Sequence, residues 1–157
     1  MTAFAKARLL ALIVPSALMA GALGSQYIGG LVPCEMCQWQ RWPHEVAIVL
    51  ALFAFAFRNV AIQRWAVVLA ALAILVSGAI GGFHAGVEYG WWEGLTSCSQ
   101  PPGVGDGNFM DNIMKSPLVR CDEAQWTLFG VSLAGFNALI SVGAGAAIFN
   151  LLRNRAA

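Results

Sequence analysis

Four long apolar stretches constrain the fold of this chain more than any other feature of its sequence. The stretches are about residues 9–33, 38–57, 65–89 and 126–152. A helix needs roughly 20 apolar residues to cross a bilayer, and the second stretch reaches that length only if its outer turns accept Arg41 and Glu45. Only 11% of the 157 residues are charged, against roughly 25% in an ordinary soluble domain. The sequence therefore predicts one all-α integral membrane domain, a bundle of four transmembrane helices.

The first stretch has an alternative interpretation as a secretory signal peptide. Lys6 and Arg8 form a basic start, and the small residues of "LMAGALG" offer a cleavage site. The apolar core of a signal peptide is typically ~7–15 residues long, whereas Leu9 to Pro33 runs for 25 residues without a charge. We therefore expect this stretch to be retained as the first membrane span.

The basic residues predict how the bundle is oriented. Six of them fall at the N-terminus, in the loop 58–64 or at the C-terminus, and the acidic residues fall on the other side or at its membrane edge. Cytoplasmic loops carry the Lys/Arg excess, so we expect both termini in the cytoplasm and two periplasmic loops, at about residues 31–40 and 90–125. No basic cluster is interleaved with aromatic residues, so we expect no nucleic-acid binding.

The four cysteines all lie on the predicted periplasmic side, as Cys34, Cys37, Cys98 and Cys121. An oxidising compartment favours disulfides. A structural bridge gains little from closing a loop of about four residues, whereas Cys-x-x-Cys is a common arrangement for thiol–disulfide chemistry. We therefore favour a redox role for Cys34 and Cys37. For Cys98 and Cys121, 23 positions apart, a redox role and a structural staple remain equally open.

A metal site is a competing interpretation of the same cysteines, since His44 and His84 could complete a set of zinc ligands. A closed zinc site usually pairs its ligands at short spacings in both halves. The second cysteine pair here is widely spaced and lies in a predicted oxidising compartment. We therefore expect no metal.

Arg41 follows Cys37 by four positions, so that a helix beginning near Cys37 places both on one face. A lone arginine at this depth ordinarily extends toward lipid phosphates. Beside a cysteine pair, however, a cation and a helix N-terminus both stabilise a thiolate, and arginine can donate hydrogen bonds to the carbonyl oxygen of a lipid-soluble oxidant. A disulfide generator needs an electron acceptor, and the sequence has no flavin or nucleotide fingerprint. We therefore expect a membrane quinone.

His84 and Glu88 are spaced i and i+4 near the outer end of the third span. Ionisable residues at that depth are functional candidates, and quinone reduction consumes two protons, so a proton route is one role for the pair. The alternative is a satisfied interfacial histidine beside a solvated glutamate. The choice stays open for His84, and the solvated interpretation is favoured for Glu88. We expect His44 and Glu45 only to mark the outer turns of the second helix.

These features together resemble the disulfide bond formation protein B (DsbB) family. The motifs that carry the resemblance are "PCEMCQWQR", "HAGVEYGWW" and "CDEAQWTLFG", and the resemblance covers nearly the whole chain. This family's oxidase and its quinone keep the bacterial periplasm oxidising. The resemblance implies a protein dithiol:quinone oxidoreductase in the bacterial inner membrane, multi-pass, with its active site facing the periplasm and ubiquinone or menaquinone as electron acceptor.

The resemblance also implies a role for each cysteine. Cys98 would be attacked by a reduced, periplasmic thioredoxin-like oxidase of the DsbA type, which forms a mixed disulfide. Cys121 would be the loop partner of Cys98 and would exchange with Cys34. Cys37 would be the thiolate that faces the quinone.

Further site residues follow from the same resemblance. Arg41 would contact the quinone, and His84 corresponds to a family histidine near the quinone site. Glu88 is characteristic of one branch and receives no role, and Gln40 stands where some members carry an acidic residue. Two alternative functions remain: a structural membrane protein with two stapling disulfides, and a family paralogue that serves a different partner.

Overall fold

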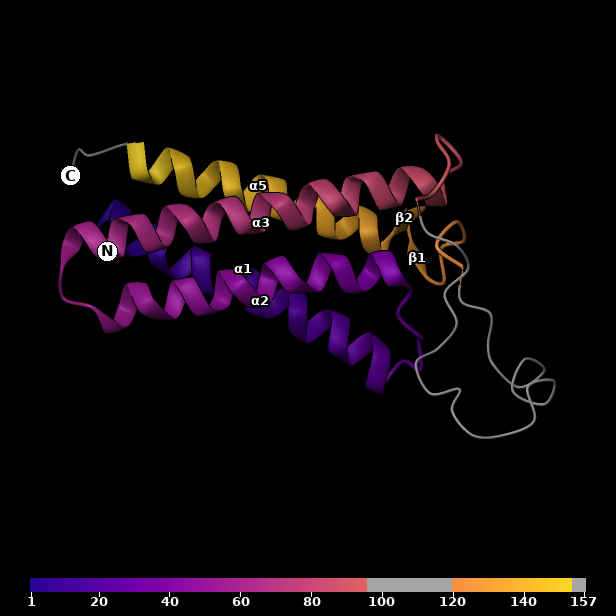
Figure 1. Cartoon of the computed structure of the whole chain (residues 1–157), viewed down its shortest axis with the longest axis horizontal. Coiled ribbons are helices and arrows are strands. Elements are labelled where there is room, and N and C mark those ends of the chain that lie inside the picture. Colours follow the sequence, from indigo (N-terminus) through magenta and orange to yellow (C-terminus); the bar gives the residue numbers. More distant parts are fainter. Residues whose placement is uncertain (96–119, 154–157) are drawn as a thin grey trace.

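Within residues 1–95 and 120–153, which the computed structural model describes, the chain forms four α-helices and one short hairpin. In chain order these are α1 (Ala3–Tyr27), α2 (Glu35–Ala56), α3 (Val60–Glu88), β1 (Thr127–Leu128), β2 (Val131–Ser132) and α5 (Leu133–Arg153). The helices lie along the long axis of the molecule and α1 crosses behind the others (Figure 1). The predicted all-α bundle is confirmed, with the hairpin as an addition.

Three of the described helices are long and apolar enough to cross a membrane, namely α1, α3 and α5. α2 is not among them, because its first half carries polar side chains and the charged residues Glu35, Arg41 and Glu45. This helix begins at Glu35, before the point near residue 38 where the predicted second span begins. The polar first half of α2 is the part of the bundle in which the cysteine pair lies.

The two ends of the bundle differ in what they carry. The N-terminus, the connection 57–59 between α2 and α3, and the last turn of α5 lie at one end, whereas the connection from α1 to α2 and the hairpin lie at the other (Figure 1). Arg58 and Arg153 are at the first end, and Cys34 is at the second. The placement of the helix ends agrees with the side-to-side charge separation expected from the sequence.

Small side chains fill the half of the bundle away from the cysteines. The buried residues of this core are Ala7, Ala11, Ala47, Ala51, Ala54, Ala66, Val67, Ala70, Ala71, Ile74, Ile148 and Leu152. Lipid tails are as apolar as the side chains themselves, so membrane helices gain most from close backbone approach, which small residues permit. The alanines therefore hold the four helices together at this end.

Gly78 allows the same close approach between α3 and α5 in the middle of the bundle. A Cβ atom at this position would lie 2.9 Å from Cβ of Ser141 and 3.3 Å from Cγ2 of Val142. A larger residue at Gly78 would push α5 away from α3. The close approach brings polar groups of the two helices within hydrogen-bond distance of each other.

The start of each of the first three helices is fixed by a side chain that accepts backbone N–H groups. Thr2 Oγ1 accepts from Ala5, and Asn59 Oδ1 accepts from Ala61 and Ile62. In α2 the same position is taken by Cys34. Unpaired N–H groups at a helix start need such acceptors. The sulfur of Cys34 therefore stabilises the start of α2 in addition to any chemical role.

The hairpin occupies the beginning of the predicted fourth span, which starts at residue 126. Its register pairs Thr127 with Ser132 and Leu128 with Val131. The turn residues Phe129 and Gly130 have φ angles of +52° and +77°, as a two-residue hairpin turn with both central residues left-handed requires. A helix cannot pass through this conformation, so α5 begins only at Leu133.

Tyr89, at the end of α3, fastens the hairpin to the bundle. Its hydroxyl donates to the carbonyl of Gly130 and accepts from the N–H of Ser132, both at 2.9 Å. These two bonds fix the segment that leads from Cys121 into α5.

We expect Tyr89→Phe to loosen the hairpin without unfolding the bundle. A hydrogen bond contributes about 0.5–1.5 kcal/mol, so amide hydrogen exchange at Ser132 should accelerate by roughly 10-fold. The control is Tyr27→Phe, because Tyr27 is 77% exposed and should leave exchange at Ser132 unchanged. Unaltered exchange in Tyr89→Phe would contradict the role given to the hydroxyl.

Candidate functional site

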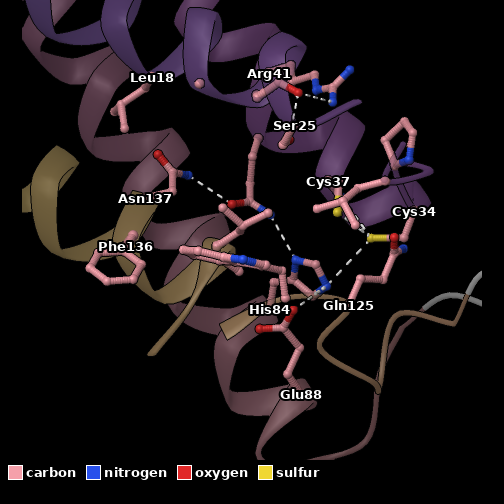
Figure 2. A pocket seen from close by; sticks show the side chains of 18 of the residues that line it. Leu18, Ser25, Cys34, Cys37, Arg41, His84, Glu88, Gln125, Phe136 and Asn137 are labelled. Carbon is pink, nitrogen blue, oxygen red and sulfur yellow. Dashed lines mark hydrogen bonds and ion pairs between the residues drawn. The ribbon is translucent and has the colours of Figure 1, made fainter. Parts of the chain in front are cut away.

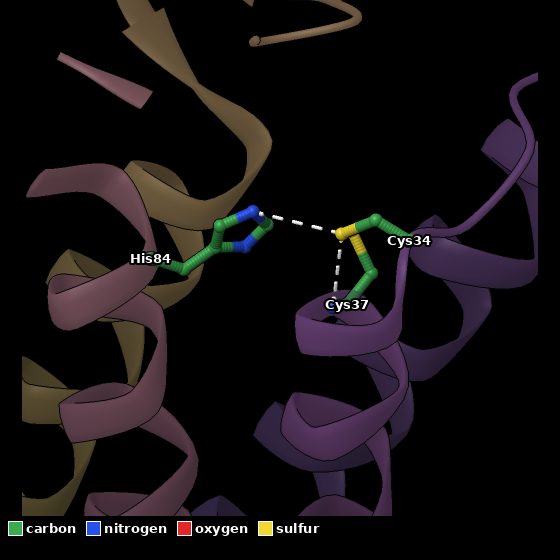
Figure 3. Close-up of side chains that lie close together, drawn as sticks. All are labelled: Cys34, Cys37 and His84. Carbon is green, nitrogen blue, oxygen red and sulfur yellow. Dashed lines mark hydrogen bonds between the residues drawn. The ribbon is translucent and has the colours of Figure 1, made fainter. Parts of the chain in front are cut away.

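The two cysteines of the Cys-x-x-Cys motif meet at the N-terminus of α2 (Figure 3). Sγ of Cys34 accepts the backbone N–H of Cys37 at 3.2 Å. The two Sγ atoms are 2.7 Å apart, so that one thiol donates to the other sulfur. Cys34 is 2% exposed, whereas Cys37 is partly exposed. The pair is a dithiol in which Cys37 is the more accessible sulfur.

The contact between the two sulfurs shifts the pKa values of Cys34 and Cys37 in opposite directions. The hydrogen bond from the Cys34 thiol lowers the pKa of Cys37, and the charge of Arg41 acts in the same direction, while burial and the charge of Glu88 oppose them. The same hydrogen bond, together with burial, raises the pKa of Cys34. Both cysteines precede the predicted span that begins near residue 38. The electrostatics therefore favour a thiolate on Cys37 and a thiol on Cys34.

His84 reaches the cysteine pair from α3. Its Nε2 lies 3.6 Å from Sγ of Cys34 (Figures 2 and 3). The side chain of Gln40, on α2, hydrogen-bonds to Nδ1 at 2.9 Å. His84 is 2% exposed and directly contacts a sulfur atom, so it is more than an interfacial histidine.

Glu88 lies one helical turn beyond His84 and is turned toward the same place (Figure 2). Its Oε1 is 3.8 Å from Nε2 of His84, and its side chain is only 7% exposed. Its Oε2 is buried and has no hydrogen-bond partner among the described residues. The expectation of a solvated glutamate is therefore wrong, because the hairpin and α5 cover this end of α3.

Arg41 is held by α1. One guanidinium nitrogen donates to Oε1 of Gln26 at 2.6 Å, and another donates to the carbonyl of Ala22 at 3.3 Å. Guanidinium has five N–H donors, so donors remain for a further partner. The side chain thus points across the bundle toward α1, on the opposite side of the site from Glu88 (Figure 2).

A pocket of about 210 Å³ lies between these groups. Its polar lining includes Cys34, Cys37, Arg41, His84 and Glu88. Apolar side chains of α1 and α5, such as Leu18 and Phe136, form much of the remaining wall (Figure 2). An apolar cavity of about 150 Å³ is enough to hold a benzene ring. The pocket therefore has the size for a substituted ring and polar groups at one side to orient it.

A network of buried polar side chains lies next to the pocket and joins α2, α3 and α5. Its members are Gln40, His44, Ser77, Asn137 and Ser141, none more than 9% exposed. Nε2 of His44 lies 2.9 Å from both Oδ1 of Asn137 and Oγ of Ser77. The expectation that His44 only marks an outer turn is wrong, because it faces the bundle interior, whereas Glu45 is exposed.

Sequence reasoning missed this network, although a signal was present. Gln40 and His44, and likewise Asn137 and Ser141, are spaced i and i+4 within otherwise apolar helices. Polar side chains at that depth face the interior of a bundle and pair with one another, so the spacing indicates two polar faces that meet.

The two remaining cysteines are only partly described. Cys121 is 7% exposed and packs in a buried cluster with Cys34, Met36 and Val87. Cys98 lies outside the described residues. Three of the four predicted cysteines therefore come together at one end of the bundle.

Three potential metal ligands also meet here. The Sγ atoms of Cys34 and Cys37 and a ring nitrogen of His84 lie within 4.8 Å of one another. Thiolate and imidazole are ligands that zinc accepts, so the separation of these atoms alone would permit a cation. Whether His84 can act as a ligand depends on which ring nitrogen carries its proton.

The fold and the site together define a class of protein: an all-α bundle of the membrane-helix type, with a cysteine pair beside an apolar pocket at one end. The model of the family "Disulfide bond formation protein DsbB" matches residues 5–151. The chain therefore belongs to the DsbB family, and with it has a role in disulfide bond formation as a disulfide oxidoreductase.

Individual relatives agree with this assignment. The chain is 30% identical over 152 residues to disulfide bond formation protein B of Methylococcus capsulatus. The match covers 92% of this chain and 90% of the relative. It is 32% identical over 123 residues to the protein of that name from Acinetobacter baumannii, covering 73% and 71%. An uncharacterized protein of Rickettsia prowazekii is 24% identical over 122 residues, covering 75% and 70%. No solved structure gives a significant match.

The lowered pKa of Cys37 predicts how its alkylation depends on pH. Only the thiolate reacts, so in the reduced protein with Cys98 and Cys121 replaced by serine, the rate with iodoacetamide should rise with pH through the pKa of Cys37. The midpoint should lie below the ordinary cysteine value of about 8.5. Cys34→Ala removes the donor and should move the midpoint upward. A wild-type midpoint at or above the ordinary value would contradict the assignment of the thiolate.

Proposed function

We propose that this protein re-oxidises a periplasmic, thioredoxin-like dithiol oxidase of the DsbA type and passes the electrons to membrane quinone, which sustains disulfide formation in secreted proteins. The observation that carries the proposal is the shared pocket, in which the Cys37 sulfur, Arg41 and His84 line one apolar cavity. Such a cavity suits a ring that arrives from the lipid, while the opposite edge of the cysteine pair lies near Cys121.

In this proposal the chain lies in the bacterial inner membrane with four crossings, both termini in the cytoplasm and the cysteines facing the periplasm. The distribution of basic residues supports this orientation. α2 is the fourth crossing: in its polar first half Gln40 and His44 face the bundle interior and hydrogen-bond to side chains of α3 and α5, and polar groups in a membrane interior need such partners.

The exchange steps carry two electrons inward. A thiolate of the reduced partner attacks Cys98 in the Cys98–Cys121 disulfide, and the electron pair of the broken bond stays on Cys121. The Cys121 thiolate then attacks Cys34 in the Cys34–Cys37 disulfide, which leaves Cys37 as a thiolate. The partner's second thiol releases Cys98 and completes the partner's own disulfide. Cys98 then attacks Cys121 in the Cys34–Cys121 disulfide, which restores the Cys98–Cys121 bond and releases Cys34, so that Cys34 and Cys37 are left as the reduced pair. Packing of Cys121 against Cys34 in one buried cluster supports the second step.

The electrons then leave through the pocket. Closing the Cys34–Cys37 disulfide again gives up two electrons, and quinone takes them up with two protons to become quinol. Arg41 uses two of its donor groups on α1, and a remaining N–H orients a quinone carbonyl oxygen and stabilises the negative charge that develops on it. His84 lies beside the same cavity, and we place it at the quinone, with Glu88 as a neighbour through which protons reach the ring.

The potentials require the quinone to drive the cycle. DsbA is itself a strong oxidant, at about −120 mV, so a disulfide that re-oxidises it must be comparably oxidising or be drained of electrons. Contacts that favour the Cys37 thiolate stabilise the reduced form of its pair and so raise its potential. Transfer of electrons to quinone re-oxidises the Cys34–Cys37 pair and so removes the reduced product of the exchange.

The test is stopped-flow absorbance of quinone with purified protein and a reduced thioredoxin-like partner. We expect quinone consumption by the wild type, none by Cys37→Ser, and no reduction of quinone by partner dithiol in Cys98→Ser. A chain whose cysteines merely staple its loops would stay oxidised when the partner is added. A paralogue with another partner would reduce quinone with a small dithiol but not with a DsbA-type protein.

We expect Arg41→Ala to slow quinone reduction much more than partner exchange. Loss of a charge-assisted hydrogen bond costs about 1.5–3 kcal/mol, so the quinone step should slow by roughly 10- to 100-fold while the exchange of disulfides changes by less than about 3-fold. Arg41→Lys should recover part of the rate, and Arg58→Ala, at the other end of the bundle, is the matched control. Equal slowing of both half-reactions would contradict the assignment.

A further inference from the structure

The buried polar network fixes the orientation of two side-chain amides. Nδ2 of Asn137 donates to the backbone carbonyl of Ser77 at 3.2 Å. Oδ1 of the same amide accepts the hydroxyl of Ser141 at 3.0 Å. A carbonyl can only accept, so the NH₂ group of Asn137 must face Ser77. This orientation also directs an N–H of Asn137 toward Oε1 of Gln40, at 2.9 Å.

Gln40 is oriented by two partners in turn. Its Oε1 accepts from Asn137, and its Nε2 donates to the backbone carbonyl of Met36 at 3.1 Å. The second N–H on Nε2 points at Nδ1 of His84, 2.9 Å away. A flipped amide would place oxygen against the Met36 carbonyl and nitrogen against the Asn137 NH₂ group, which would lose both bonds. Gln40 therefore presents a donor, and not an acceptor, to His84.

A neutral histidine carries one proton on its two ring nitrogens, and the nitrogen that accepts a hydrogen bond is the one without it. Because Nδ1 of His84 accepts from Gln40, the ring proton is on Nε2. That nitrogen faces Sγ of Cys34 at 3.6 Å, and Oε1 of Glu88 at 3.8 Å. His84 is thus a donor toward the cysteine pair.

We propose that Gln40 is a positioning residue that fixes the proton of His84 on Nε2, and that this proton directs the Cys34 thiol hydrogen toward Cys37. With Nε2 protonated, Sγ of Cys34 receives a hydrogen bond from His84 and donates its own hydrogen across the 2.7 Å contact to Cys37. With the proton on Nδ1 instead, Nε2 would accept the Cys34 hydrogen, and the donor to Cys37 would be lost.

The same tautomer opposes metal capture by the site. Ligation through Nε2 requires that nitrogen to be unprotonated, so the proton would have to be on Nδ1. Nδ1 would then face the N–H of Gln40, donor against donor. The two sulfurs and the ring are close enough to hold a cation, but the amide of Gln40 holds the ring in the form that does not bind one. A dithiol site is thereby kept available for exchange.

Other charged and titratable groups near the pair come from several segments. Among the described residues they include Arg41 and His44 on α2, His84 and Glu88 on α3, and Arg120, Cys121 and Glu123 before the hairpin. Gln40→Glu adds one more negative charge to this set, so the test needs a readout that reports the ring proton itself and not only the pKa of Cys37.

The direct test is ¹⁵N NMR of the reduced, histidine-labelled full-length protein, with His84 assigned by its loss in His84→Asn. In the wild type we expect the proton on Nε2. In Gln40→Glu, whose carboxylate can accept a hydrogen bond, we expect it on Nδ1. Gln40→Met, which removes the amide, should give a mixture. A proton on Nδ1 in the wild type, or the same tautomer in all three proteins, would overturn the proposal.

Zinc binding gives a second readout. We expect Gln40→Glu to bind Zn²⁺ at least 10-fold more tightly than the wild type, because outer-shell partners of a ligating histidine change metal affinity by about 10- to 100-fold. The matched control is Gln63→Glu, the same substitution at a glutamine that contacts Arg8 at the opposite end of the bundle, which should bind as the wild type does. Equal affinities in Gln40→Glu and the wild type would count against the proposal.

The consequence for turnover rests on the proposed function, but the ring proton and the zinc affinity are measured without partner or quinone. If the wild type carries the ring proton on Nε2 but does not reduce quinone, only the proposed function is rejected. An active wild type with the Nδ1 proton would reject the role of Gln40 alone.

Discussion

Pairing of polar groups in a water-free interior is the constraint on which the rest of the site depends. An amide or hydroxyl left without a partner costs about 1–3 kcal/mol, so the buried polar side chains at the cysteine end of the bundle are stabilised by hydrogen bonds to one another. Gln40 and Asn137 also donate to the carbonyls of Met36 and Ser77, which are fixed by the helices themselves. The backbone thereby fixes the orientation of the Gln40 and Asn137 amides. Through these amides it determines which ring nitrogen of His84 carries the proton in the proposed arrangement.

The two halves of the bundle serve different needs. Alanines bring the helices close at the end of the bundle away from the cysteines, whereas polar residues and a pocket occupy the end that carries the cysteines. The α1 helix takes part in both, because Ala7 and Ala11 are buried in the core while Ala22 and Ser25 line the pocket. Tight packing at one end holds the helices together. The fold therefore stays stable although a cavity large enough for a ring lies at the other end.

Much of this architecture is predictable from the sequence, since length, hydropathy and the Cys-x-x-Cys motif depend on local pattern. The presence of α1 and α3 follows that pattern, whereas a place for His84 near the site is implied only by the resemblance to the family. The hairpin does not, because its turn depends on a left-handed Phe129, a conformation uncommon for such a residue. The spacing of Gln40 and His44 indicates a polar face on α2, but the groups of α3 and α5 that they meet depend on how the helices are placed against one another, which a linear sequence does not specify.

Cys34 caps α2 with the same sulfur atom that takes part in the proposed exchange. A sulfur engaged in a new covalent bond changes its position and its capacity to accept the N–H of Cys37. The first turn of α2 carries Cys37 and leads to Arg41. One sulfur atom is therefore shared between helix initiation and the proposed chemistry, at the start of the helix that supplies both Cys37 and Arg41 to the wall of the cavity.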